Sequence, residues 1–413
     1  MGKNNLIVSL DVGTTKTRAI ACDPAPDGFP NIVGLGIAST HGLTRGSIID
    51  MEATTASIRA CFEDLKQSLG HMPLATHLSV NGCNISSQIV RVETVVKQAK
   101  GAITHADIDH VLEMAHRASL PEDRQILMAF PVGFILDGTE GIRDPAGMYG
   151  NVLGAEVHMI TGSVGPIRNL TSCVNAAELA VDGEITAQAL AAAEAVLSEQ
   201  EKQLGVVLVD IGGGTTDLAL YTDGVPWHTA SIPLGGLNIT KDISYGLKLP
   251  QDVAEELKLQ YATVSDGALD DETEIDAPGF YPGSWTMLRQ RDLAMIVVAR
   301  MEEILELIKD EIRRTGYFDV LPAGVVFTGG GSELHGFEEL ASAVLGLPVR
   351  QGVVPVMRGM NEYLCRAEFA TSIGLTMYAA RLQRARVRRP MSAALGSVAE
   401  RLGSLMRPFI PMS

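Results

Sequence analysis

Several kinds of functional site find little support in this sequence of 413 residues, because the side chains that build them are few or badly spaced. The five cysteines are scattered, odd in number and never spaced C-x-x-C, which argues against a disulfide framework or a cysteine zinc site and indicates free thiols in a reducing cytoplasm. The nine histidines show no H-E-x-x-H or other metal-ligand spacing. Neither a G-x-S-x-G nor a G-x-x-x-x-G-K-[ST] motif occurs, so the sequence patterns of two large enzyme classes are missing.

Long apolar segments are missing as well. No run approaches the roughly 18 uncharged apolar residues of a membrane-spanning helix. The first five residues are polar and Leu6 opens a strand, so we expect neither a signal peptide nor, without Ser or Thr at position 6, a myristoyl group. Hydrophobic residues make up 46% of the chain and charged residues 20%, which is typical of globular proteins, and the length predicts two or more domains.

The charge is unevenly distributed along the chain. The total is −16, yet residues 381–413 contain seven arginines and one acidic residue, Glu400, and so carry +6. Once the +6 of this tail is subtracted from the total, the remaining residues carry −22. Such a body is expected to be repelled by nucleic acid, whereas the tail is expected to be attracted to an anionic surface.

Periodicity predicts an alternation of strands and helices with one change of character. Segment 83–161 contains strand-like stretches and one helix, Asp107–Ala118 after the cap-like Thr104, and is predicted to be a small α+β subdomain. An alanine-rich helix is predicted over 186–203. The later predicted elements are a strand at Val206–Asp210, a hairpin turn at Asp223-Gly224, an acidic loop at Asp266–Asp276, a helix over 288–314, a strand at Val325–Thr328, a helix at Thr371–Arg381 and a basic linker over 382–394.

Two short segments share one plan that points to phosphate binding. Each has an apolar strand that ends in Asp, a Gly two residues later, then threonines and a second strand. The first contains Asp11, Gly13, Thr14, Thr15 and Lys16, and the second contains Asp210, Gly212, Gly213, Gly214, Thr215 and Thr216.

The residue types in these loops suit a nucleotide triphosphate. We expect the glycines to reach positive φ and to bring backbone N–H groups to phosphate, while Thr hydroxyls donate and Lys16 adds a positive charge. Asp11 and Asp210 are expected to face each other and to suit Mg²⁺, which keeps several waters and takes few protein ligands. Each loop alone could be a plain tight hairpin, but two in the same register argue for a duplicated domain.

Two further segments suit the sugar and base end of a nucleotide. Gly329, Gly330 and Gly331 follow a strand and permit the close approach that a side chain would block. Gly235 and Gly236 precede a helical segment that carries Glu255 and Lys258, candidates for ribose and adenine contacts. The alternative for these two charged residues is a solvated helix face.

The three loops, at 10–17, 209–217 and 328–331, resemble the phosphate-1, phosphate-2 and adenosine motifs of the actin, Hsp70 and sugar-kinase superfamily. Within it the chain resembles the FtsA family of bacterial cell-division proteins over essentially its whole length. The small subdomain is placed at 83–161, as in that family, rather than within Ser39–Asp50. The phrases Arg45-Gly-Ser-Ile-Ile-Asp50 and Glu140-Gly-Ile-Arg-Asp-Pro-Ala-Gly147 are similar to that family's local sequence, and the chain ends, like it, in a linker and an amphipathic helix.

This resemblance implies an α/β fold: an actin-like two-domain ATPase with a relocated small α+β subdomain in the first domain and a C-terminal amphipathic helix. The implied divisions are a domain 1 core at 1–82, 162–204 and 366–381, the insertion at 83–161, domain 2 at 205–365 with an outer subdomain at 230–300, the linker at 382–394 and the helix at 395–413. The family binds ATP with Mg²⁺ and forms actin-like filaments. It tethers the FtsZ ring to the cytoplasmic face of the inner membrane at the division septum, as a peripheral protein that recruits later division proteins.

One position departs from the superfamily's pattern and bears on catalysis. The connecting helix often reads Glu-Pro-x-Ala-Ala-Ala, with Glu near the attacking water, whereas this chain has Gln188 there, followed by Ala191-Ala-Ala. Glutamine can orient a water but cannot accept its proton, so beside Asp210 we expect at most a slow ATPase. The alternative is that Gln188 lies away from the phosphate altogether.

Other members of the superfamily offer competing functions. A sugar kinase needs a substrate-side base and a polar sugar pocket, and the sequence identifies neither. A pilus-assembly ATP-binding protein shares the relocated subdomain but is expected to lack the terminal amphipathic helix. An Hsp70 chaperone needs a substrate-binding domain, which about thirty residues after the ATPase core cannot supply. Fold alone does not decide among these functions, so the tail and the insertion carry the choice.

The tail has the pattern of a helix that lies on a membrane surface. At 100° per residue one face of the helix is apolar, and its members fall within roughly 100° of one another: Leu395, Val398, Leu402, Leu405, Met406 and Phe409. Arg401 and Arg407 lie on the other side and suit anionic lipid headgroups. The alternative is a helix packed on the body of the protein. The arginines before Pro390 argue for a solvated linker instead.

We therefore predict that removal of residues 392–413 releases the protein from membranes while ATP binding persists. Leu402→Glu or Phe409→Glu should have nearly the same effect, because a charge would enter the apolar face. Flotation with anionic vesicles measures the attachment. A truncated protein that floats as well as the full chain would refute the membrane tether.

Overall fold

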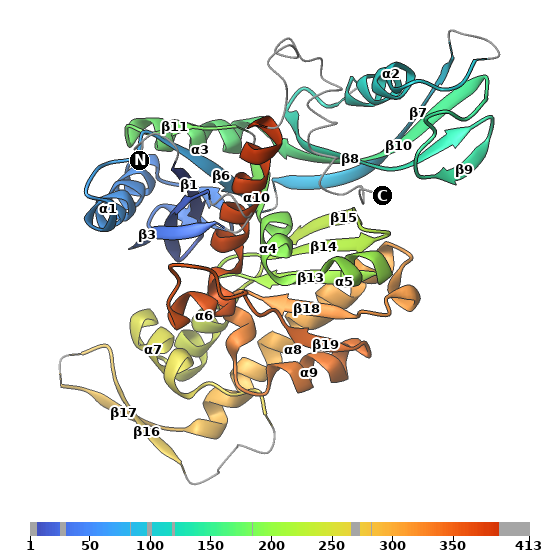
Figure 1. The fold of residues 1–413 in the computed structure, drawn as a ribbon. Helices are drawn as coiled ribbons and strands as arrows, with labels where there is room; N and C mark the ends of the chain where they lie inside the picture. The colour runs from blue at the N-terminus through green and yellow to red at the C-terminus, as the bar shows by residue number, and fades with distance from the viewer. Residues whose placement is uncertain are drawn as a thin grey trace.

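The computed structural model describes residues 6–24, 30–82, 84–96, 101–117, 120–183, 185–265, 273–281 and 283–387. Two sheets lie on either side of a pair of packed helices, and a third sheet lies beside them (Figure 1). The first sheet has the order β11-β6-β1-β2-β3, with β12 also paired to β6. Its strands are β1 (Ile7–Val12), β2 (Lys16–Asp23), β3 (Asn31–Ser39), β6 (Ala75–Val80), β11 (Ala180–Val181) and β12 (Thr186–Ala187).

The second sheet repeats the plan of the first. Its order is β15-β14-β13-β18-β19. In each sheet an antiparallel hairpin, β1–β2 or β13–β14, is flanked by a parallel strand, β6 or β18. The strands are β13 (Val206–Ile211), β14 (Thr216–Thr222), β15 (Val225–Ile232), β18 (Val325–Thr328) and β19 (Val349–Gln351). The predicted duplication is therefore present in the structure.

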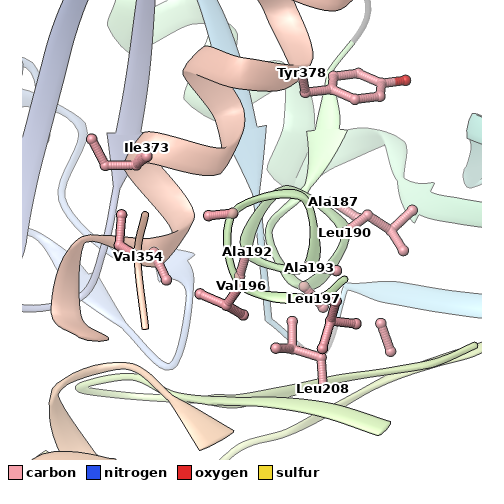
Figure 2. Packing of buried hydrophobic residues seen from close by; sticks show 14 of the residues in the cluster. Ala187, Leu190, Ala192, Ala193, Val196, Leu197, Leu208, Val354, Ile373 and Tyr378 are labelled. Carbon is pink, nitrogen blue, oxygen red and sulfur yellow. The ribbon is translucent and has the colours of Figure 1, made fainter. Parts of the chain in front are cut away.

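The two sheets are joined through helices α4 (Gln188–Val196) and α10 (Ala370–Val387), which pack against each other. Figure 2 shows α4 nearly end-on, with Ile373 and Tyr378 of α10 on one side and Leu208 of β13 on another. Alanines make the close packing possible, and so does Gly374, because a Cβ there would lie 1.8 Å from the carbonyl oxygen of Ala191. The small side chains of these helices thus set how near the sheets can come.

The remaining helices cover the outer faces of the sheets. Helices α1 and α3 pack together beside the first sheet, and α8 packs with α6 and α9 beside the second. Their bounds are α1 (Met51–Leu69), α3 (Val164–Ala176), α6 (Gly236–Leu247), α7 (Gln251–Tyr261), α8 (Gln290–Arg314) and α9 (Phe337–Leu345). Within the described ranges no helix is both long and apolar enough to cross a bilayer.

Three expectations about local structure were wrong. The single helix expected over 186–203 is divided, because Ser198 caps a second helix, α5 (Glu199–Leu204), through reciprocal bonds with Glu201. The end of the expected acidic loop belongs to a hairpin of β16 (Glu274–Pro278) and β17 (Trp285–Arg289). The expected basic linker is helical as far as Val387, the end of α10. The predicted amphipathic helix at 395–413 and the linker beyond residue 387 lie outside the described residues.

The third sheet, of order β7-β10-β8-β9, belongs to the segment inserted after β6. Its strands are β7 (Ile85–Val95), β8 (Arg124–Leu136), β9 (Thr139–Ile142) and β10 (Val152–Ser163), and α2 (His105–His116) covers it after the Thr104 cap. The insertion follows a strand of the first sheet in the chain, yet the insertion also contacts the second sheet. The Ser87 hydroxyl donates to the Thr229 carbonyl at 2.8 Å and accepts from the Thr229 N–H at 3.0 Å.

A buried histidine lies where the insertion meets β15. His158 on β10 is fully buried beside a cavity of about 160 Å³, which Ser87, Trp227 and His228 also line. His228 pairs with Glu311 of α8 at 2.9 Å. Burial, and then the nearby His228, lower the pKa of His158 from 6.5 to about 3, against an opposing backbone hydrogen bond with Pro226. The folded protein therefore holds His158 neutral.

We expect His158→Leu to make the protein less sensitive to acid. A histidine whose folded-state pKa is lowered costs nothing above its unfolded pKa of about 6.5, and stability is lost as the pH falls from there toward 3. At pH 5 this loss is about 2 kcal/mol in the wild type and absent in the variant. Urea unfolding at pH 7.5 and pH 5 measures it, with the exposed His105→Leu as control. Equal acid sensitivity in wild type and His158→Leu would contradict the interpretation.

Candidate functional site

A cavity of about 470 Å³ lies between the first and second sheets, where the turns of the two hairpins meet. The β1–β2 turn and the β13–β14 turn are each closed by the same kind of backbone bond, from Gly13 N to Lys16 O and from Gly212 N to Thr215 O. The structure brings most of the predicted site residues to this cavity. Those that line it are Asp11, Gly13, Thr14, Thr15, Lys16, Gln188, Asp210, Gly212, Gly213, Thr215, Gly236, Glu255, Lys258, Gly329, Gly330 and Gly331.

Three predicted site residues do not line the cavity but hold the loops that do. A Cβ on Gly214 would lie 2.6 Å from the Thr14 hydroxyl of the opposite loop. Thr216 donates its hydroxyl to the Leu234 carbonyl at 2.9 Å. A Cβ on Gly235 would lie 2.5 Å from the Gly212 carbonyl. These positions support the site and are not expected to touch a ligand.

The reason for glycine in these loops differs from the expectation. No glycine in either hairpin turn has positive φ; among the site glycines only Gly329, at 81°, lies in that region. The turns instead need glycine for close approach. A Cβ on Gly213 would lie 2.5 Å from the Thr15 side chain across the cavity, so the two loops touch at their tips.

Three carboxylates are buried in the floor of the cavity. Asp11 accepts from Ser372 at 3.0 Å, and Asp210 accepts from the Thr371 hydroxyl at 2.6 Å. The third, Asp217, lies across the hairpin from Asp210 and was not predicted. Burial raises the pKa of all three, and for Asp210 the charges of Asp217 and Asp11 add to burial and bring the pKa to about 7.

This excess of buried negative charge fits a cation. Nowhere in the described ranges do three or more His, Cys, Asp or Glu side chains form a group that could hold a metal by themselves. Asp11 and Asp210 match the one or two carboxylates that Mg²⁺ takes together with waters and phosphate oxygens. Mg²⁺ at this position stays a prediction.

Gln188 lies in the wall of the cavity, at the start of α4. Its side chain is buried, and its amide nitrogen donates to Asp11 at 2.6 Å. Gln188 therefore lies in the cavity, and its distance from a bound phosphate stays a prediction. The same hydrogen bond fixes the amide group beside a candidate metal ligand.

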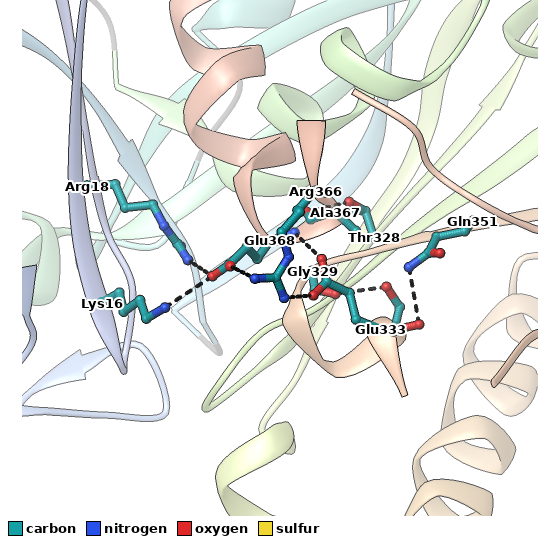
Figure 3. A network of polar contacts seen from close by, with 10 residues as sticks. Lys16, Arg18, Thr328, Gly329, Glu333, Gln351, Arg366, Ala367 and Glu368 are labelled. Carbon is teal, nitrogen blue, oxygen red and sulfur yellow. Dashed lines mark hydrogen bonds and ion pairs between the residues drawn. The ribbon is translucent and has the colours of Figure 1, made fainter. Parts of the chain in front are cut away.

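A group of charged residues lies where the β1–β2 turn ends and β2 begins (Figure 3). Lys16 and Arg18 both pair with Glu368, at 3.3 Å and 2.5 Å. Arg366 pairs with Glu368 at 3.1 Å and also with Glu333. Of these residues only Lys16 was predicted. Arg18 could have been found, because residues two apart on a strand share a face, whereas Glu368 is distant in sequence and carries no local signal.

The predicted ribose and adenine contacts are paired with each other. Lys258 donates to Glu255 at 2.7 Å and to the Gly236 carbonyl at 3.1 Å. Both side chains line the cavity, so they are not a solvated helix face. Their pair ties α7 to the start of α6, next to the β13–β14 turn.

Comparison with known proteins agrees with this geometry. The family model described as "Cell division protein FtsA" matches residues 207–374, and "SHS2 domain inserted in FTSA" matches residues 82–161. The chain is 36% identical to the Cell division protein FtsA of Pseudomonas aeruginosa over 90% of this chain and 89% of that protein. It is 37% identical to that of Neisseria meningitidis serogroup B over 91% and 90%, and 37% identical to that of Bacillus subtilis over 92% and 85%.

The chain belongs to the FtsA family of cell division proteins. Solved structures confirm its predicted actin-like fold. A PilM-PilN type IV pilus biogenesis complex superimposes with a TM-score of 0.62 at 14% identity, over 91% of this chain and 98% of that chain. MreB5 of Spiroplasma citri bound to ADP superimposes with a TM-score of 0.57 at 15% identity, over 94% and 100%. At such identities the likeness shows the fold alone.

Gly213→Val is expected to abolish ATP binding while the protein still folds. The branched side chain would meet Thr15 and push the two turns apart. Asp210→Ala should act on the same binding by removing a buried carboxylate. The control is Gly133→Val on β8, where no atom lies within 4 Å of the added Cβ. Equilibrium binding of a fluorescent ATP analogue decides; unchanged affinity in both cavity variants would sink the assignment.

Proposed function

We propose that the chain binds Mg²⁺-ATP in the cavity between its two sheets and uses it to assemble into filaments that attach FtsZ to the membrane. The observation that carries the nucleotide is the convergence of three loops from distant parts of the chain, at Gly13, Gly213 and Gly330, on one cavity with buried carboxylates. Solved structures of MreB5 of Spiroplasma citri, which share the fold, contain ADP or AMPPNP. Membership of the FtsA family supports the role in division.

Different residues of the cavity suit different parts of the nucleotide. The N–H groups and hydroxyls of the two hairpin turns, with Lys16, would hold the phosphates. Asp11 and Asp210 would hold Mg²⁺, which neutralises phosphate charge when bound. The loop at Gly330, where a Cβ would find no atom nearer than 3.9 Å, leaves open space for the nucleoside, and the Glu255–Lys258 pair lines that side.

We propose at most slow hydrolysis of the bound ATP. Gln188 can position a water but cannot accept its proton, and its amide nitrogen is engaged by Asp11. Catalysis would then rest on positioning and on the charge of Asp210 and the metal. ATP would serve chiefly as a ligand that fixes the relation between the two sheets.

Self-association is proposed to run end to end. An actin-like subunit presents different faces at its two ends, and a heterologous contact that does not close a ring gives a filament. The insertion protrudes from one end of the molecule, next to β15 of the second sheet (Figure 1), and is our candidate for part of this contact. A filament displaying many terminal helices would bind an anionic inner-membrane surface by avidity, although each helix binds weakly.

The alternative functions would use the same cavity but would act on other partners or substrates. The structural likeness to a pilus biogenesis complex concerns the fold and does not favour a pilus role over the family's role in division. A sugar kinase would have to transfer phosphate to a small molecule. An assay of phosphate transfer to a panel of sugars separates the kinase from the scaffold.

The scaffold is tested by sedimentation of the full chain with FtsZ and anionic vesicles, with and without Mg²⁺-ATP. We expect FtsZ to move into the vesicle fraction only with the chain and ATP, and filaments to form on a lipid monolayer under the electron microscope. Neutral vesicles and Ser404→Glu, which falls on the polar side of the helix predicted from the sequence, are the matched controls for Leu402→Glu. FtsZ that stays in solution, or a chain that stays monomeric on lipid, would reject the proposal.

A further inference from the structure

One short segment contacts three of the loops that line the cavity. Residues Arg366–Thr371 lead from the end of the second domain into the first turn of α10, a helix that packs on the first sheet. The Ala367 carbonyl accepts from the N–H of Gly329 at 3.2 Å, and Thr371 donates to Asp210 at 2.6 Å. Glu368 completes the set by pairing with two cations that follow the β1–β2 turn. The segment is therefore bonded to both hairpins and to the glycine loop after β18.

The two cations on Glu368 are held very differently. The Arg18 side chain is only 12% exposed, pairs at 2.5 Å and lies over the ring of Phe369 at 4.8 Å. The Lys16 side chain is 43% exposed and pairs at 3.3 Å, at the limit of a hydrogen bond. Arg18 is thus a fixed partner of Glu368, whereas the Lys16 ammonium can leave at little cost (Figure 3).

Glu368 itself stays ionised. Burial would raise the pKa of this carboxyl, but the charges of Arg18, Lys16 and Arg366 outweigh burial and lower it. The carboxylate lines the same cavity as the two hairpin turns, and its side chain is 11% exposed. A phosphate in the cavity would therefore compete with a permanent negative charge for the Lys16 ammonium.

We propose that Glu368 is a positioning residue that pairs with Lys16 as long as no phosphate competes for it, and yields Lys16 to phosphate when nucleotide binds. Arg18 remains on Glu368 and keeps the carboxylate in place. The exchange of Lys16 between Glu368 and phosphate changes the charge balance at the start of α10 with each binding event. This inference rests on the proposed nucleotide site.

The proposal predicts an increase in ATP affinity when Glu368 is replaced, which a glutamate that only supports the fold would not give. Glu368→Gln should bind Mg²⁺-ATP more tightly, by roughly two- to fivefold, because the competing charge is removed from a partly exposed pair. The gain should be lost in the Lys16→Met background, and the affinity of Glu368→Gln should fall more steeply with KCl than that of the wild type. A glutamate that only supports the fold would instead weaken binding when replaced.

Calorimetric titration of Mg²⁺-ATP into the wild type, Glu368→Gln, Lys16→Met and the double variant tests the inference. Glu339→Gln, which removes the same charge from the exposed face of α9, should leave the affinity unchanged. Glu368→Asp keeps the charge and should bind like the wild type, which covers the case in which the glutamine variant does not fold. Weaker or equal binding by Glu368→Gln, or a gain that persists in the Lys16→Met background, would overturn the inference. A wild type that binds no Mg²⁺-ATP would reject the nucleotide site, and with it this role.

Discussion

The contact between α4 and α10 sets the geometry of the whole molecule. Gly374 lets the two helices approach until a single added carbon would meet the Ala191 carbonyl at 1.8 Å. Helix α4 packs on β13 and β14, and α10 packs on β1 and β2, so the helix pair fixes the distance between the sheets. At that distance the hairpin turns touch, Gly213 against Thr15. The geometry of the cavity thus depends on four small residues, Gly374, Ala191, Gly213 and Thr15, at these two meeting points.

The cavity holds charges that the fold alone would not favour. Asp11, Asp210 and Asp217 are buried near one another, and each has a raised pKa. Burial of like charges destabilises a protein unless they are paired or neutralised. Lys16 and Arg18 both pair with Glu368, and the charge of Arg18 only partly offsets the effect of burial on Asp11 and Asp210. Buried groups that lower the stability of the fold in this way are expected at a functional site and not elsewhere in the core.

The sequence could predict what depends on neighbours in the chain. Local patterns predicted the strand–turn–strand loops, the Thr104 cap and the alternation of strands and helices. The resemblance to a known family predicted the fold. The role of Glu368 could not be predicted, because its partner Lys16 lies 352 positions away. Nor could the use of glycine at Gly213, since positive φ and close approach select the same residue and only the facing Thr15 distinguishes them. The break at Ser198 was readable, because Ser198 and Glu201 have the spacing of a capping box.

The insertion gives the two domains a second connection, far from the helix pair. It continues from β6 through Asn81, whose amide donates to the Thr215 hydroxyl at 3.5 Å, a long bond next to the second hairpin turn. Its β7 then bonds to Thr229 at the edge of the second sheet through Ser87. A rotation of one sheet against the other must therefore carry the insertion along or break these bonds. An ion pair of Arg143 with Asp223 at 2.6 Å adds to these bonds, and buried residues of β8 and β10 belong to the same apolar cluster as residues of β13 and β14. The insertion is thus tied to the second sheet by packing as well as by edge bonds, and it couples to any change in the angle between the sheets.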